Sequence, residues 1–310
     1  MEMLRVCLPV IVTLLIGMVF REKKIISSDG VNALQALVMN VTLPINLFAN
    51  FYKTNISPDT LIFPLTFFIV TAGGIFLGKL ICKVCKKDDP FLPFLMTGYE
   101  AGMLGYALLG IMIGADKITT FAMIDMGHVL AIFTVYTAMA KGVEGKGQSA
   151  KDMLRSIFTT PVLIAIIIGI LFGFTGIGQA IDGTGFGPVL AGLCDFLAAP
   201  TSVAILIVIG FRLKFKGIDY KAVSQALILR IVMQVVMAVA VIVLFKSLGG
   251  VFGETLSILS VVMMIILPPP YVLPLYINEE GRKEFYSSAI SAYTLLSIIG
   301  FIIMTGVVLL

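Results

Sequence analysis

The sequence predicts an all-α polytopic membrane protein with ten transmembrane helices, arranged as two inverted five-helix repeats whose fourth and ninth helices are broken and cross. Three observations lead to this prediction. Of the 310 residues, 59% are hydrophobic and only 13% are charged, whereas a soluble domain carries about 25% charged residues. Apolar stretches of about 20 residues, the length that spans a bilayer, recur along the chain. Basic residues gather in every second connector between these stretches.

The apolar stretches leave no segment long enough for a soluble domain. The first one is followed by Arg21, Lys23 and Lys24 and lacks a small-residue cleavage site, so we interpret it as a retained helix rather than a signal peptide. The predicted spans are residues 3–20, 31–52, 60–81, 91–114, 118–140, 156–176, 187–212, 221–245, 255–277 and 286–310.

The connectors after the odd-numbered spans hold most of the 22 lysines and arginines. Cytoplasmic loops carry this excess of positive charge in membrane proteins. We therefore expect a multi-pass protein of the cell (plasma) membrane with both termini outside. The net charge of +4 comes from loop lysines, which favours membrane orientation over nucleic-acid binding.

The connector at residues 142–155 divides the chain into a first repeat, 1–141, and a second repeat, 156–310. We expect this connector to be a cytoplasmic loop. Because each repeat has an odd number of spans, the two repeats enter the membrane from opposite sides. Inverted repeats of this kind are typical of secondary transporters.

Segments hostile to helix formation fall at corresponding places in the two repeats. Pro44 and Pro200 interrupt the second and seventh spans, and residues 97–105 and 267–274 interrupt the fourth and ninth. Proline removes a backbone donor and clashes with the preceding turn. Backbone groups freed in this way cannot face lipid, so they line a cavity or bind a ligand. Simple kinking is the alternative interpretation, since glycine and proline are common in membrane helices.

These breaks define the candidate substrate site. Glu100 lies inside the glycine-rich break of the fourth span, where a carboxylate takes a proton or holds a cation; its alternative role is that of a protonated core acid. The predicted substrate-binding residues are Asn46, Gly98, Tyr99, Glu100, Gly102, Pro200, Arg230, Pro269, Pro270 and Tyr271.

Other ionisable residues lie at membrane depth. Arg230 either neutralises Glu100 or Asp195 structurally or receives a substrate carboxylate through its two-pronged guanidinium. Asp125 and His128 are three residues apart and share one helix face. Together with Glu100 they are the candidate residues for coupling or proton relay, because histidine titrates near neutrality; a packing role is the alternative for His128.

Several motifs are assigned no chemistry. The Cys82-x-x-Cys85 pair lacks two further ligands for a metal, and we predict neither a metal nor a cofactor. The stripe formed by Ser287, Ser291 and Thr294 is interpreted as a helix–helix contact. No phosphate-binding G-x-x-x-x-G-K-[ST] motif is present in the sequence.

The N-x-x-L-P-x-x-L-F pattern at residues 40–48, the glycine-rich break in the fourth span and the proline-rich break in the ninth span resemble the auxin efflux carrier family. The resemblance covers the whole chain. It implies a fold similar to that of bile-acid sodium symporters, with a scaffold domain and a transporter domain. It also places residues 98–105 and 268–271 at a crossover beside the substrate. Where relatives commonly carry an Asn-Thr-Gly-type stretch, this chain has Glu100.

We therefore expect a permease, a secondary active transporter of small organic anions such as carboxylates, that works by alternating access at the midplane crossover. Bacterial permeases in the family are proposed to carry malate and malonate. The expected partners of this chain are a small-molecule substrate, a coupling proton or sodium ion, and the lipid bilayer. A homodimer is a further alternative for its oligomeric state. The alternatives are a symporter of another small solute, a passive channel and a membrane-embedded enzyme. The enzyme is less favoured, because the single histidine, His128, cannot form a zinc-binding H-E-x-x-H motif.

Overall fold

The computed structural model describes residues 2–52, 58–114, 117–145, 158–213 and 219–308, together with positions 149, 151 and 155. Within these residues, all regular secondary structure is helical. Seven of the described helices are long and apolar enough to cross a membrane, and two further apolar helices are shorter. The prediction of an all-α membrane protein is confirmed, whereas the ten-span inverted repeat stays a prediction.

The helical segments of the first half follow the predicted spans closely. They are α1 Glu2–Glu22, α2 Ser28–Leu37, η1 Val38–Thr42, α3 Leu43–Phe51, η2 Pro58–Leu61, α4 Ile62–Val84, α5 Leu92–Met96, η3 Ala101–Gly105, α6 Tyr106–Ile113, α7 Thr119–Ala131, η5 Ile132–Tyr136 and α8 Thr137–Val143.

The second half contains two short helices beyond the predicted spans, α11 and α15. Its segments are α10 Pro161–Thr175, α11 Ile177–Asp182, α12 Gly187–Ala198, α13 Thr201–Arg212, α14 Tyr220–Leu248, α15 Gly250–Gly253, α16 Thr255–Ile266, η6 Leu273–Tyr276 and α17 Glu280–Val308.

One of the predicted interruptions, at Pro44, does not break its helix, and another, at Pro200, separates two helices within a single span. Residues Ser28–Phe51 form one continuous helical span, in which the π-helical turn η1 directly precedes α3 and Pro44. Residues Gly187–Arg212 also form one span, with Pro200 at the junction of α12 and α13. A wider π turn absorbs the missing proline donor without ending the helix. The helix therefore continues through Pro44, whereas α12 ends at Ala198 and α13 begins at Thr201 on either side of Pro200.

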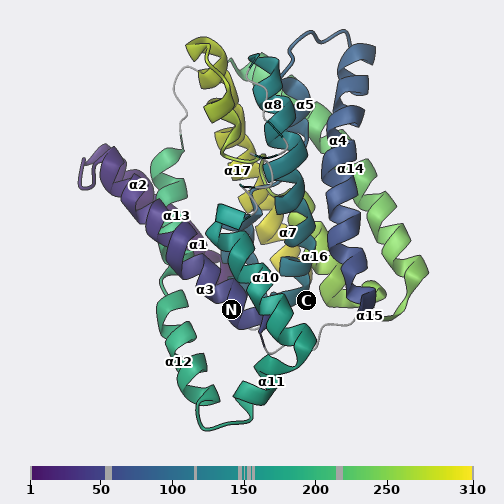
Figure 1. Cartoon of the computed structure of the whole chain (residues 1–310). Helices are drawn as coiled ribbons and strands as arrows, with labels where there is room; N and C mark the ends of the chain where they lie inside the picture. Colours follow the sequence, from purple (N-terminus) through teal and green to yellow (C-terminus); the bar gives the residue numbers. More distant parts are fainter. Residues whose placement is uncertain are drawn as a thin grey trace.

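The helices pack as two groups, and each group takes segments from both halves of the chain. In the first group, α1 packs along α13, and α3 packs along α10 and α12. In the second group, α4 packs against α5 and α7, and α14 packs against α5, α16 and α17. Both chain termini lie in the lower half of the view, while the α1–α2 turn and the first turns of α17 lie in the upper half (Figure 1).

The close approach of α1 to α13 depends on two glycines. A Cβ atom at Gly17 would overlap the backbone of Ile207 and Phe211, and one at Gly210 would overlap the backbone of Leu14. Small residues let membrane helices approach backbone to backbone, which increases their van der Waals contact. Glycine is therefore needed at both positions.

We expect Gly17→Ala to destabilise the protein, because its new methyl group meets a backbone that cannot rotate away. The cost should be about 1–3 kcal/mol, the usual range for overpacking. The matched control is Gly73→Ala in α4, where an added Cβ meets nothing within 4 Å. That change should be neutral or stabilise the helix by about 0.5–1 kcal/mol. Thermal unfolding in detergent, followed by far-ultraviolet circular dichroism, measures both; equal effects would contradict the close α1–α13 approach.

Candidate functional site at the crossing helix breaks

The two interrupted spans meet at their breaks. Helix α5 ends at Met96 and η3 begins at Ala101, while α16 ends at Ile266 and η6 begins at Leu273. The backbone N–H of Glu100 donates to the carbonyl of Pro268 at 2.8 Å, and the N–H of Tyr271 donates to Glu100 Oε2 at 2.6 Å. These reciprocal hydrogen bonds join the two breaks directly.

Gly98 allows this close approach. Its φ angle is +75°, in the region that side-chain-bearing residues rarely adopt. A Cβ atom at Gly98 would also lie 2.8 Å from Pro270 Cγ. Pro269 and Pro270 are buried beside it. Thus the glycine of one break fits against the proline run of the other.

Arg230 of α14 holds both breaks from one side. Its side chain is fully buried, with 0% exposure. One terminal nitrogen donates to Leu95 O at 2.8 Å, and the other donates to Gly98 O at 2.8 Å and to Leu267 O at 3.0 Å. Carbonyls at a helix C-terminus have no intrahelical partner and form the negative end of the helix dipole. The guanidinium therefore caps the ends of α5 and α16 together.

A second side chain of α14 supports the same break. Gln234, one turn after Arg230, donates to Met96 O at 2.7 Å and accepts from the hydroxyl of Tyr99 at 2.7 Å. The guanidinium of Arg230 also lies 4.7 Å from the ring centroid of Tyr293, within the range of cation–π attraction. The direct partners of Arg230 are thus carbonyls and rings, rather than Glu100 or the exposed Asp195.

Asp125 and His128 of α7 are buried beside the break between α5 and η3. Their side chains are 0% and 3% exposed. His128 Nδ1 lies 2.9 Å from Asp125 Oδ1, and His128 Nε2 accepts a hydrogen bond of 3.0 Å from the N–H of Tyr99. The hydroxyl of Tyr106 donates to Asp125 Oδ2 at 2.9 Å. The pair predicted from its spacing is therefore formed, and it contacts the backbone of the break.

The remaining predicted residues lie elsewhere. Asn46 on α3 accepts a hydrogen bond from Asn50, one turn later on the same helix. Gly102 faces side chains of the second span rather than the ninth. Pro200 is exposed at the junction of α12 and α13. The structure brings together Gly98, Tyr99, Glu100, Pro269, Pro270 and Tyr271, and it does not place Asn46 or Pro200 with them.

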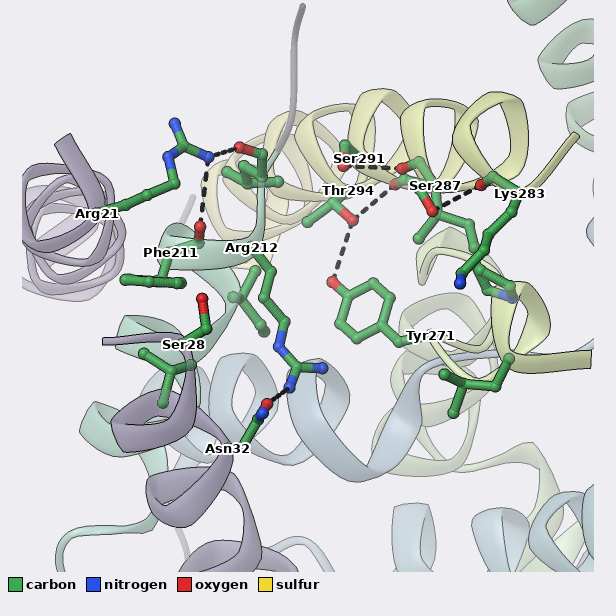
Figure 2. A pocket seen from close by; sticks show the side chains of 16 residues that line it. Arg21, Ser28, Asn32, Phe211, Arg212, Tyr271, Lys283, Ser287, Ser291 and Thr294 are labelled. Carbon is green, nitrogen blue, oxygen red and sulfur yellow. Dashed lines mark hydrogen bonds between the residues drawn. The ribbon is translucent and has the colours of Figure 1, made fainter. Parts of the chain in front are cut away.

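A cleft of about 430 Å³ reaches the crossover at Tyr271. One wall comes from α1, α2 and α13, and the other from η6 and α17 (Figure 2). Three basic side chains line it, Arg21, Arg212 and Lys283, and none of the 16 lining residues is acidic. The lining of the cleft is therefore basic and lies between the two helix groups. Two of these cations, Arg21 and Lys283, also form ion pairs with Glu22 and Glu280 outside the lining.

Arg212 is the cation placed best for a ligand. Its guanidinium projects between Asn32 and Tyr271 (Figure 2) and donates to Asn32 Oδ1 at 2.8 Å. It also attracts the carboxylate of Glu100 electrostatically. Arg21, in contrast, donates to the carbonyls of Phe211 and Leu213, which end α13. One arginine thus secures the cleft wall while the other points into the cleft.

The opposite wall corrects one interpretation of the sequence. Ser287, Ser291 and Thr294 of α17 line the cleft and are not merely a helix–helix contact. The hydroxyls of Thr294 and Tyr271 are 3.0 Å apart, which links this wall to the break between α16 and η6. The regular spacing of Ser287, Ser291 and Thr294 on one helix face is the sequence pattern that could have predicted a polar cleft wall. Arg212 gave no such signal, because a basic residue at a helix end is also what membrane orientation requires.

Comparison with known proteins agrees with this architecture. A family model described as "Membrane transport protein" matches residues 3–309. An uncharacterized transporter of Methanothermobacter thermautotrophicus is 22% identical over 302 residues, which cover 94% of each chain. The uncharacterized transporter YfdV of Escherichia coli is 26% identical over 182 residues, covering 55% of this chain and 58% of its own.

We expect Arg230→Met to destabilise the protein severely, because three buried carbonyls lose their donor. Each unsatisfied buried group costs about 1–3 kcal/mol. The control is Arg282→Met, which removes a partly exposed ion pair with Glu279 worth about 0–1 kcal/mol. Thermal unfolding and the yield of monodisperse protein measure the difference. A well-folded Arg230→Met protein that has lost only substrate binding would instead support a direct substrate contact.

Proposed function

This chain belongs to the membrane transport protein family that includes the auxin efflux carriers, and from that premise we propose that it is a secondary active transporter of small organic anions, with carboxylates as the substrate class. The observation that carries the proposal is the cationic cleft that ends at the crossing breaks. Arg21, Arg212 and Lys283 line it without an acidic neighbour in the lining. Guanidinium groups bind carboxylates through short, charge-assisted pairs of hydrogen bonds.

The mechanism we propose is alternating access at the crossover. The cleft lies between the group formed by α1, α2 and α13 and the group that contains η6 and α17. Movement of one group against the other closes the cleft on one side and opens it on the other, as inverted-repeat transporters do around a central site. With the basic connectors in the cytoplasm, this conformation faces inward and both termini lie outside the cell membrane.

Glu100 takes the role of charge compensation in this proposal. When its carboxylate is ionised, Glu100 attracts Arg212 electrostatically, so the guanidinium has a counter-charge when the site is empty. An arriving substrate carboxylate competes for the same cation. Because like charges repel, Glu100 also favours release of the substrate. The acid found in place of the family's neutral amide is thereby compatible with an anionic substrate.

We expect Arg212→Gln to raise the KM for carboxylate uptake about tenfold or more, since a charge-assisted hydrogen bond contributes about 1.5–3 kcal/mol. Saturable uptake of labelled malate, malonate and similar carboxylates into proteoliposomes is the measurement. Lys246→Gln, at an exposed position on α14 outside the cleft, should leave KM unchanged. No saturable flux of any carboxylate in the unmodified protein would contradict the proposed function.

We expect Glu100→Gln to lower both KM and the maximal rate of uptake. The amide oxygen still accepts the hydrogen bond from Tyr271, so the crossover stays formed, but the charge that opposes the substrate is lost. Uptake and exchange, each with and without a proton or sodium gradient, separate affinity from turnover. Full activity of this variant under a proton gradient, with unchanged KM, would show that Glu100 has no part in transport.

A further inference from the structure

His128 is the single histidine of the chain, and its two ring nitrogens have different partners. Nε2 accepts a hydrogen bond from the backbone N–H of Tyr99, with 3.0 Å between the two nitrogens. A backbone N–H is always a donor, so Nε2 must be an unprotonated acceptor. The imidazole proton then lies on Nδ1, where it is donated to Asp125 Oδ1 at 2.9 Å. The fold therefore selects one neutral tautomer of His128.

Asp125 completes this arrangement. Besides the imidazole, the hydroxyl of Tyr106 donates to its second oxygen at 2.9 Å. Each oxygen of Asp125 thus accepts one hydrogen bond, which suits an ionised carboxylate because both of its oxygens act only as acceptors. Asp125 thus provides a counter-charge for His128 if the imidazole becomes positively charged.

From these contacts we propose that His128 is the binding site of a coupling proton. Proton binding at Nε2 and the present conformation of the break between α5 and η3 exclude each other. The proposal rests on the proposed function, which it deepens. The step is a simple proton transfer: a hydronium ion gives its proton to the Nε2 lone pair, leaving water and an imidazolium beside the Asp125 carboxylate. No redox partner or leaving group is involved.

The exclusion follows from hydrogen-bond chemistry. After protonation, an Nε2–H group would point at the N–H of Tyr99, and two donors repel each other. Both groups are buried, with His128 at 3% and Tyr99 at 2% exposure, so water does not satisfy them. The N–H of Tyr99 must move away to another acceptor. Tyr99 lies between Gly98 and Glu100, so this movement changes the break that adjoins the cleft.

The surroundings of His128 contain few competing charges. The ionisable neighbours are Asp125 from the same helix, Tyr106 from α6, and Tyr99 and Glu100 from the break. Arg230 of α14 lies 5.7 Å from the ring centroid of Tyr99, and its guanidinium is held by three carbonyls. Of the other helices packed against α7, α3, α10 and α16 carry no ionisable side chain. Those of α4 are Lys79, Cys82 and Lys83, in its last two turns.

The burial of Nε2 gives the coupling a direction. In this conformation the lone pair is occupied and shielded, so the described state is the proton-free one. Proton loading takes place in a conformation in which Tyr99 has moved. A ligand that binds one of two conformations shifts the population toward it. Protons should therefore stabilise the alternative arrangement of the crossover.

A direct test uses nitrogen NMR of protein labelled with ¹⁵N in histidine, whose single residue gives one set of imidazole signals, together with ¹⁵N-tyrosine labelling. At neutral pH we expect the Nδ1–H tautomer with an unprotonated Nε2. Acidification should produce the imidazolium and shift the Tyr99 amide at the same midpoint. An Nε2–H tautomer, an imidazole that does not titrate, or a titration that leaves the Tyr99 amide unmoved would each overturn the proposal.

A transport test uses His128→Gln in proteoliposomes with labelled malate. The glutamine oxygen can accept from Tyr99 but does not titrate. We expect exchange at equal pH to persist and acceleration by an imposed proton gradient to be lost. Glu100→Gln is the comparison, and it should transport more slowly yet keep its response to the gradient. If His128→Gln keeps its acceleration by the proton gradient, the proposal is overturned. If the unmodified protein shows no flux, the proposed function is contradicted, and the NMR titration then decides whether His128 binds the proton.

Discussion

The structure depends on satisfying backbone groups where two helices stop inside the membrane. Lipid offers these groups no hydrogen bonds, and Arg230 supplies donors to the carbonyls at the ends of α5 and α16 with one buried side chain. A guanidinium suits this task because it carries several donors in a rigid plane and remains charged. Its positive charge also matches the negative ends of both helix dipoles. A buried cation without a carboxylate partner is therefore stable here.

The other features of the site follow from this cap. The carbonyl ends are held by Arg230, and N–H groups of the same breaks have other acceptors: Tyr271 N–H donates to the Glu100 carboxylate, and Tyr99 N–H donates to His128 Nε2. Each break is thus held by one cation and one acceptor. The hydroxyl of Tyr271 connects the crossover to the cleft wall through Thr294. In the mechanism we propose, a change in substrate or proton occupancy would act on the same few backbone groups.

Residue type predicted the breaks at residues 97–105 and 267–274, because glycine and proline act locally through φ preferences and missing donors. The same reasoning overestimated Pro44, where the helix continues through a π turn, whereas Pro200 does separate α12 from α13. It also grouped Asn46 with the crossover, although Asn46 pairs with Asn50 on its own helix. The Asp125–His128 pair was predictable, since a three-residue spacing aligns side chains on any helix. Its contact with Tyr99 was not, because that contact spans separate helices.

The sequence by itself determined the membrane environment, the helical class, the approximate position of many helices and the two long helix breaks. These properties depend on composition and on preferences that extend over a few neighbouring residues. Only the tertiary structure decided that Arg230 binds carbonyls, that Arg212 points into the cleft, that the α17 hydroxyls line it and which nitrogen of His128 accepts a hydrogen bond. The physical reason is that a charged or polar side chain can be satisfied by many partners. Which partner it has depends on the packing of helices that are distant in the chain.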